Sequence, residues 1–268
     1  MKKTFVSLLS VAVLGMLLPS CLGDGGDQSY EVQREFGVIN IGEVNQIPTT
    51  QAAMSNGLTI TGGDISNYST GDIVLITYKA SLNNFVSPTT IQTDYAVINE
   101  DDVFKSANQK SVIEKPVENN TPSAETAFTT ISIQAGHPSE FFLNRWLIGV
   151  SANLKKDQEI AGVELYYDEN KQTLDNMTLP DDAIILDVKL LKTASTGGST
   201  ETATKSKLVP LNLTSLRSLD PKNMENPSTE KITYIWLRYP KYDSSTQTYV
   251  EGILQKAMAI AFYPEANK

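Results

Sequence analysis

The chain has 268 residues, of which 40% are hydrophobic, and its 31 acidic residues outnumber 22 basic ones to give a net charge of -9. This acidic balance excludes nucleic acid as a partner, because a negatively charged domain repels phosphate backbones. The single cysteine, Cys21, excludes a disulfide framework and a cysteine-bound zinc site.

The first 20 residues have the pattern of a signal peptide. Lys2 and Lys3 precede an uncharged, mostly apolar run over residues 5–18, which is shorter than the about 20 residues that a membrane-spanning helix needs. Ser20 and Cys21 end a stretch that resembles the lipobox of bacterial lipoproteins. We therefore expect residues 1–20 to be a lipoprotein signal peptide, cleaved between Ser20 and Cys21, with Cys21 as the lipidated residue. An ordinary secretory signal with a chance cysteine is the alternative.

Lipidation at Cys21 predicts stable membrane attachment, because two or more acyl chains hold a protein at a membrane and one chain binds only marginally. Leu22 occupies the position where an aspartate would resemble an inner-membrane retention signal. The expected location is therefore the outer membrane, on its periplasmic or cell-surface face. Residues 21–34, glycine-rich at their start, are expected to be a flexible lipidated tether.

Residues 35–114 predict a small β-domain. Short runs of β-forming residues alternate with Gly-, Asn- and Asp-containing turns, and no helical period persists over a helical length. Five short strands in about 80 residues favour a closed barrel, since closure removes exposed sheet edges. The predicted strands are residues 36–41, 58–61, 73–79, 93–98 and 103–104, with an acidic turn at residues 99–102.

Two motifs of this domain resemble a known family. Residues 57–60 (GLTI) are followed about a dozen positions later by residues 71–78 (GDIVLITY). This pairing is similar to the N-terminal OB-like barrel of the NigD-like lipoproteins of Bacteroidetes. The resemblance implies a C-terminal β-sandwich behind the barrel and no established enzymatic activity. The chain differs from the family in lacking an acidic residue before Gly57.

Residues 115–127 are polar and contain two prolines, which predicts an inter-domain linker or a long surface loop. Beyond this linker, residues 128–264 predict an antiparallel β-sandwich, because short strands are separated by turn-rich loops. The fold class is therefore all-β, a small OB-like barrel followed by a sandwich. The strands predicted here are residues 128–133, 141–150, 160–167, 183–191, 208–213 and 232–239, and the terminal segment 252–263 is also expected to be β-structure.

Candidate catalytic residues are scarce. His137 is the only histidine, and it precedes a proline in a predicted loop, so a histidine-based metal site cannot be assembled. No phosphate-binding glycine loop, nucleophile elbow or EF-hand spacing occurs. We expect no catalytic residue, no metal and no cofactor, and the chain is predicted not to be an enzyme.

The remaining candidates are aromatic residues on a predicted hairpin near the C-terminus. Tyr239, Tyr242 and Tyr249 lie near its expected tip, and exposed aromatic side chains bind sugar rings or other proteins. The predicted function is a lipid-anchored envelope protein that binds an envelope or extracellular partner, either a protein or a glycan. Three alternatives stay open: a glycan-binding lipoprotein of a polysaccharide-uptake system, an envelope hydrolase that uses His137 or paired carboxylates, and a fimbrial subunit.

Overall fold

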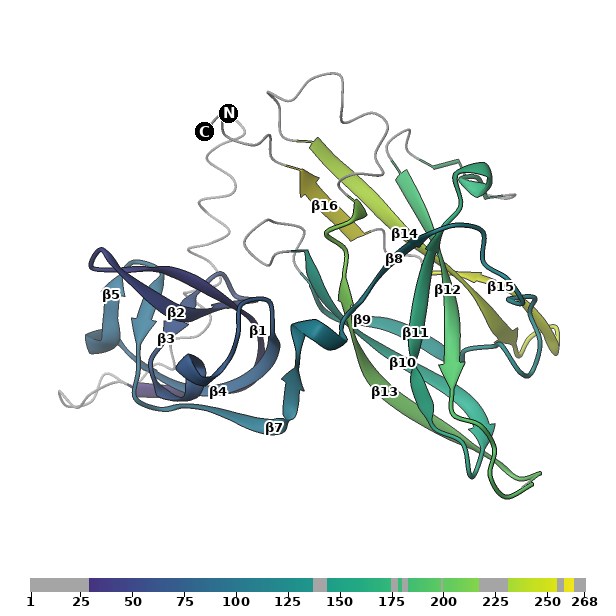
Figure 1. Ribbon diagram of the computed structural model, residues 1–268, viewed down its shortest axis with the longest axis horizontal. Coiled ribbons are helices and arrows are strands. Elements are labelled where there is room, and N and C mark those ends of the chain that lie inside the picture. Colours follow the sequence, from purple (N-terminus) through teal and green to yellow (C-terminus); the bar gives the residue numbers. More distant parts are fainter. Residues whose placement is uncertain are drawn as a thin grey trace.

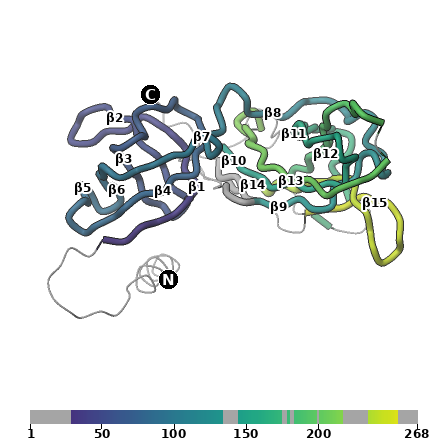
Figure 2. The backbone as a smooth tube through the Cα atoms, turned by 90° about the horizontal axis from the view of Figure 1, so that it is seen from below, coloured from purple at the N-terminus to yellow at the C-terminus, as the bar shows by residue number. Residues whose placement is uncertain are grey.

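The computed structural model describes residues 29–136, 144–174, 178–179, 183–198, 200–216, 231–254 and 258–262; in this part, the side chains of residues 134–136, 231–233 and 258–262 are not described. The expected signal peptide with Ser20 and Cys21, and also His137, lie outside the described residues. The described chain forms two β-domains that lie side by side (Figures 1 and 2). No helix in the described part is long and apolar enough to span a membrane.

The first domain contains, in the described residues, a seven-stranded sheet in the order β5-β6-β3-β2-β1-β4-β7. Short 3-10 helices connect some of these strands. The strands are β1 (Ser29–Val44), β2 (Ile47–Met54), β3 (Thr59–Thr61), β4 (Ile73–Ser81), β5 (Phe85–Ser87), β6 (Thr90–Gln92) and β7 (Ala96–Phe104); the 3-10 helices are η1 (Gly63–Asn67), η2 (Leu82–Asn84) and η3 (Ser106–Asn108).

The chain between β6 and β7 closes this sheet into a barrel. The backbone N–H of Thr93 donates to the carbonyl of Thr61 in β3, and the N–H of Lys79 in β4 donates to the carbonyl of Tyr95, both at 3.0 Å. Residues 93–95 therefore link the two sides of the sheet. Closure encloses a core of buried aliphatic residues together with Tyr78.

The second domain contains, in the described residues, a nine-stranded sheet in the order β15-β14-β12-β11-β8-β13-β10-β9, with β16 paired to β14. The 3-10 helix η5 (Glu169–Lys171) follows β11. The strands are β8 (Lys110–Glu114), β9 (Thr130–Gly136), β10 (Arg145–Lys155), β11 (Ile160–Tyr167), β12 (Ala183–Lys192), β13 (Thr202–Asn212), β14 (Lys231–Asp243), β15 (Thr248–Ile253) and β16 (Met258–Phe262).

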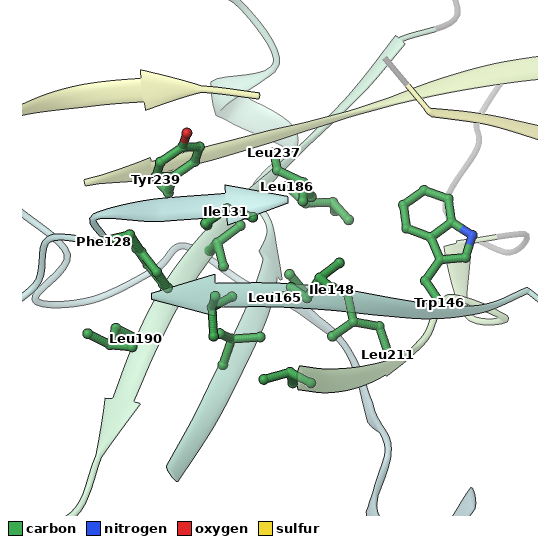
Figure 3. Close-up of a cluster of buried hydrophobic side chains, with 14 of the residues drawn as sticks. Phe128, Ile131, Trp146, Ile148, Leu165, Leu186, Leu190, Leu211, Leu237 and Tyr239 are labelled. Carbon is green, nitrogen blue, oxygen red and sulfur yellow. The ribbon is translucent and has the colours of Figure 1, made fainter. Parts of the chain in front are cut away.

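The sheet of the second domain folds over on itself as a sandwich. The N–H of Phe128, just before β9, donates to the carbonyl of Pro240 in β14 at 2.8 Å, and Phe128 forms a bridge with Lys241. Both halves of the sheet contribute to one core, in which Trp146 and Ile148 of β10 lie with Leu186 of β12 and with residues of β11, β13 and β14 (Figure 3). The all-β prediction of a barrel followed by a sandwich is confirmed.

The sandwich is mixed rather than antiparallel. β12 pairs in parallel with β14, and β8 pairs in parallel with both β11 and β13. The prediction of purely antiparallel pairing is therefore wrong for these strands. The physical reason is chain order: β13 pairs with β10, so the chain that leaves β12 crosses the domain before β14 returns beside β12 in the same direction.

A small apolar cluster joins the two domains. Leu147 of β10 is 1% exposed and packs with Phe36, Val38 and Ile73 of the barrel. Between the domains, the side-chain amide of Gln109 donates to the backbone carbonyls of Gly71 at 2.8 Å and Phe104 at 3.2 Å. The junction is therefore packed and hydrogen-bonded.

The domain boundaries differ from those expected. β8 lies in the range 35–114 that was assigned to the barrel, yet it pairs only with strands of the sandwich, so the barrel sheet ends at Phe104. β1 begins at Ser29, inside the predicted tether 21–34. Residues 115–127 follow β8, so they are a loop of the second domain rather than the connection between domains.

The predicted acidic turn at residues 99–102 lies within β7. Val103 pairs with Val74 and Ile98 with Ile76, so residues 99–102 form an irregularity opposite the single intervening residue of β4. Asp102 is 5% exposed, and its carboxylate accepts hydrogen bonds from Arg34 at 2.7 Å and Asn99 at 3.2 Å. The hydrogen bonds from Arg34 and Asn99 compensate the buried carboxylate of Asp102, so that the polar residues 99–102 can lie within β7.

Candidate functional site

Residues 115–127, here called the strap, contact β12 beyond the point where its pairing with β14 ends, and Phe128 just after them bonds to β14. The amide Nδ2 of Asn120 donates to the carbonyl of Val188 in β12 at 3.2 Å, and Lys192 of the same strand forms an ion pair with Glu125. The strap ends where Phe128 bonds to β14. It also bonds to itself, since the hydroxyl of Thr126 donates to the carbonyl of Thr121 at 2.7 Å. The strap is thus held at both ends and in the middle.

A cavity of about 360 Å³ lies between the strap and the sheet. The strap contributes one wall and β12, β14, β15 and η5 contribute the others, so the cavity is built from segments distant in sequence. The wall residues are Val117, Asn119, Asn120, Thr121 and Pro122 from the strap and Lys171, Asp187, Arg238, Tyr239, Pro240 and Glu251 from the domain body.

A buried ion pair forms part of this wall. Asp187 and Arg238 are direct partners in the parallel pairing of β12 with β14, and each side chain is 8% exposed. The guanidinium donates from Nε to Oδ1 at 2.6 Å and from Nη2 to Oδ2 at 2.9 Å. These hydrogen bonds outweigh burial and raise the pKa of Arg238 above its usual value. A guanidinium keeps its proton at any physiological pH.

Lys171 and Glu251 add one more charge of each sign at the cavity. Glu251 lies on β15 with its side chain 59% exposed, and its Oε2 is 3.9 Å from Nε of Arg238. Gln172 fixes the position of η5, because its side-chain amide donates to the carbonyl of Ile185 at 3.2 Å and accepts from the N–H of Ile185 at 2.8 Å. The wall therefore carries two cations and two anions from the described residues.

The strap contains one buried acceptor without a hydrogen-bond partner, the side-chain oxygen of Asn120. Oδ1 of Asn120 is buried and has no hydrogen-bond partner, while the same side chain is held through Nδ2. Among the described residues, no group of three or more histidine, cysteine, aspartate or glutamate side chains could hold a metal ion. The chemistry that this cavity offers is hydrogen bonding from the donors and acceptors of its wall.

Of the three predicted tyrosines, two come together. Tyr242 and Tyr249 are cross-strand partners on β14 and β15, with ring centroids 5.2 Å apart and an interplanar angle of 55°. They are 47% and 42% exposed. A hollow of about 130 Å³ beside them is lined by Ala124 and Ala127 of the strap. The pair is an exposed aromatic surface.

Tyr239 lies apart from that pair. It is 8% exposed and its ring meets the ring of Phe128 edge-on, with centroids 5.8 Å apart and planes at 85°. It packs in the sandwich core (Figure 3) and also contributes to the cavity wall. Burial raises the pKa of Tyr239. Ligand contact at Tyr239, Tyr242 and Tyr249 stays a prediction.

The cavity and the tyrosine pair follow one another along the same hairpin. Pro240 pairs with Glu251 at the cavity, and Tyr242 pairs with Tyr249 two residues further along each strand. Since side chains two apart in a strand share a face, both pairs point to the same side of the hairpin, about 7 Å apart. The cavity and the tyrosine pair are therefore neighbours on one face of the hairpin.

Sequence reasoning missed the charged wall residues. Asp187 and Arg238 are 51 positions apart, and only the parallel pairing of their strands makes them neighbours. A signal was present: Asp187 follows the apolar run 183–186, Arg238 follows the apolar run 235–237, and the two charges are opposite. Buried charges are nearly always paired, so the two strands could have been matched on that ground.

Comparison with solved structures finds the same overall fold elsewhere. A protein from Parabacteroides merdae, described as uncharacterized, superposes with a TM-score of 0.56 at 14% identity, covering 87% of this chain and 99% of that one. At lower TM-scores, a protein of unknown function DUF1344 from Bacteroides vulgatus reaches 0.43 at 12% identity, covering 85% of this chain and 91% of the other. A NigD-like immunity protein from Bacteroides caccae reaches 0.41 at 14% identity, with 86% and 94% covered.

None of these three proteins is described as an enzyme. No protein-family model matches the chain. No curated protein matches it either. With identities this low, the match to the Parabacteroides merdae protein shows that the two chains share a fold.

Proposed function

We propose that this chain is a non-enzymatic, lipid-anchored protein of the outer membrane that binds an envelope or extracellular ligand at the cavity under the strap. The observation that carries the proposal is the buried Asp187–Arg238 pair in the wall of a cavity of about 360 Å³. That volume falls in the range of small-molecule sites, which are largely formed before the ligand arrives.

The arrangement of the pair favours binding over catalysis. Both carboxylate oxygens of Asp187 accept hydrogen bonds from Arg238, so this carboxylate is held as an ion-pair partner rather than left free as a general base. A guanidinium does not release its proton at physiological pH. The two best-fixed groups of the wall therefore offer stable charge and hydrogen bonds, and not proton transfer.

The membrane anchor is the second part of the proposal. Cys21 is the proposed lipidated residue, and β1 begins only eight positions later, at Ser29. A chain of that length spans at most about 28 Å when fully extended, so the barrel would lie close to the membrane surface. The GLTI and GDIVLITY motifs, which overlap β3 and β4 of this barrel, support kinship with NigD-like lipoproteins.

Photo-crosslinking in intact cells tests the binding proposal. The crosslinking amino acid p-benzoylphenylalanine replaces Glu251 at the cavity rim, and in a control protein it replaces Ile41 of the barrel, which is 67% exposed. We expect a discrete non-lipid adduct from position 251 and none from position 41. Equal labelling at both positions, or lipid adducts alone at 251, would contradict the proposal.

Metabolic labelling tests the anchor separately. Cells that express the wild-type chain should incorporate labelled palmitate and retain the protein in the outer-membrane fraction, and Cys21→Ala should abolish both. Palmitate incorporation into the alanine variant would show that Cys21 is not the attachment point.

A further inference from the structure

The cavity and the neighbouring Tyr242–Tyr249 pair together define a class of ligand. We infer that this surface binds a neutral saccharide chain, with one terminal sugar unit in the cavity and the next unit packed on the two tyrosines. The inference rests on the proposed binding function and specifies the chemistry of its ligand.

The charge of the cavity wall argues for a neutral ligand. Its two cations, Lys171 and Arg238, are matched by two anions, Asp187 and Glu251. Arg238 is bound in both of its described hydrogen bonds by Asp187, so its charge is already compensated and does not favour a phosphate or carboxylate ligand. A free amine finds no excess of negative charge either. Ionic ligands would thus lose their hydration without a net electrostatic gain.

The hydrogen-bonding groups of the wall suit hydroxyl groups. Asp187 and Glu251 accept hydrogen bonds, Lys171 donates them, and the side chain of Asn119 does both. A hydroxyl is itself both a donor and an acceptor, so a sugar with neighbouring hydroxyls can engage an acidic and a basic group at once. Since the Asp187–Arg238 pair is buried and fixed by two bonds, its share of these contacts needs no reordering of side chains.

The aromatic pair provides the second contact. Tyr242 and Tyr249 are nearly half exposed, and their mutual packing at 5.2 Å limits the freedom that each ring would lose on binding. Sugar rings present C–H groups on their faces that pack on aromatic rings, while the tyrosine hydroxyls stay in water. The step of about 7 Å from Glu251 to Tyr249 along β15 is comparable with the length of one sugar unit. A chain of at least two units would therefore cover both features.

Affinity electrophoresis tests the inference. The full mature chain is run in native gels that contain dextran, mannan, galactan or a mixed-linkage β-glucan, with polygalacturonate as the anionic comparison. We expect retardation by at least one of the four neutral polysaccharides. This retardation should persist in about 1 M NaCl, where the Debye length is about 3 Å and ionic contacts are screened.

Matched tyrosine variants identify the surface. Tyr242→Ala combined with Tyr249→Ala should weaken the retardation constant about tenfold or more, since aromatic contacts of this kind dominate interfaces. Tyr30→Ala combined with Tyr95→Ala removes two tyrosines of the barrel with similar exposure, 48% and 40%, and should leave it unchanged. A circular-dichroism spectrum identical to wild type shows that each variant is folded.

The outcomes separate this inference from the function on which it depends. Retardation by none of the neutral polysaccharides, retardation by polygalacturonate alone, or equal loss in both double variants overturns the saccharide inference. If position 251 still crosslinks to a peptide or another non-saccharide molecule in cells, the cavity is a binding site for that other class. Failure of both experiments removes the proposed function as well.

Discussion

The Asp187–Arg238 pair gives a prediction whose size can be worked out from the structure. Asp187→Leu removes the carboxylate and leaves a guanidinium in a sheet where its side chain is only 8% exposed. Each hydrogen bond to a charged group contributes about 1.5–3 kcal/mol, and breaking a buried pair by removing one partner costs about 3–5 kcal/mol. Because the adjoining cavity admits water to the freed guanidinium, we expect a loss near 3 kcal/mol.

Removing both charges should cost much less. The double variant Asp187→Leu with Arg238→Met replaces the ion pair by apolar side chains of similar length, and such replacements are often neutral or stabilising. We expect the double variant to unfold within about 1 kcal/mol of wild type, so that the second substitution restores most of what the first removed. This reversal distinguishes an uncompensated charge from a simple loss of packing.

Urea unfolding followed by tryptophan fluorescence measures the effect. Both tryptophans, Trp146 and Trp236, lie in the sandwich domain, so the signal reports on the domain that holds the pair. With a denaturant dependence of about 1–3 kcal/mol per molar urea, the single substitution should lower the midpoint by about 1–3 M. A shift below about 0.3 M, or a double variant as unstable as the single one, would refute the reasoning.

Three further predictions concern the rest of the molecule. Leu147→Ala at the domain junction should lower stability by about 2–5 kcal/mol in urea unfolding, since the side chain is 1% exposed. Gly71→Ala should lower the free energy of unfolding by about 1–2 kcal/mol, because the φ of Gly71 is +87°, a left-handed value, and a Cβ there would lie 3.3 Å from the guanidinium of Arg145. Calorimetry measures the effect, and an unchanged melting temperature would contradict the prediction. The hydrogen bond to Glu164 raises the pKa of Tyr166 to about 12. The stability that this bond confers is therefore complete below pH 10 and is lost as the pH rises from 10 to 12. In the variant Glu164→Gln, the Tyr166 transition measured by absorbance titration should move back toward pH 10.

Local sequence patterns predict those strands whose own residues alternate or are mostly apolar. The predicted segment 160–167 matches β11, and the predictions over 73–79 and 183–191 fall within β4 and β12. The terminal strand β16 lies within the segment expected to be β-structure although its residues also suit a helix. In each of these cases the pattern that defines the strand lies inside the strand itself.

The strands that were missed depend on neighbours. β2, with the sequence IPTTQAAM, has little β propensity, but it pairs with β1 on one side and β3 on the other, and Ala52, Ala53 and Met54 are fully buried. Pairing and burial thus override local preference. β8 was missed for the same reason, since its parallel partners β11 and β13 come more than 40 positions later.

The candidate site also contains one part that depends on local sequence and one part that depends on pairing between distant strands. Tyr242 and Tyr249 face each other across a hairpin, a local structure that the sequence predicts, and β14 continues through Pro240 and Lys241 to Asp243. Asp187 and Arg238 meet only through parallel pairing of strands separated by β13. Neither strand's local pattern contains that register, so the opposite charges of Asp187 and Arg238 were the sequence signal for this part of the cavity wall.

The strap belongs to the same non-local part of the structure, and it bears on the proposed binding function. It begins at the end of β8 and ends at Phe128, whose N–H bonds to β14, so both of its ends are fixed by strands of the sandwich. Folding of the domain therefore completes the cavity wall in the absence of a ligand. The entropy lost in ordering residues 115–127 is lost on folding and does not lower the affinity for a ligand. Any ligand that fits gains the contacts of Asn119 and Arg238 without that penalty. A segment with the composition of a flexible linker thereby becomes part of a preformed cavity wall.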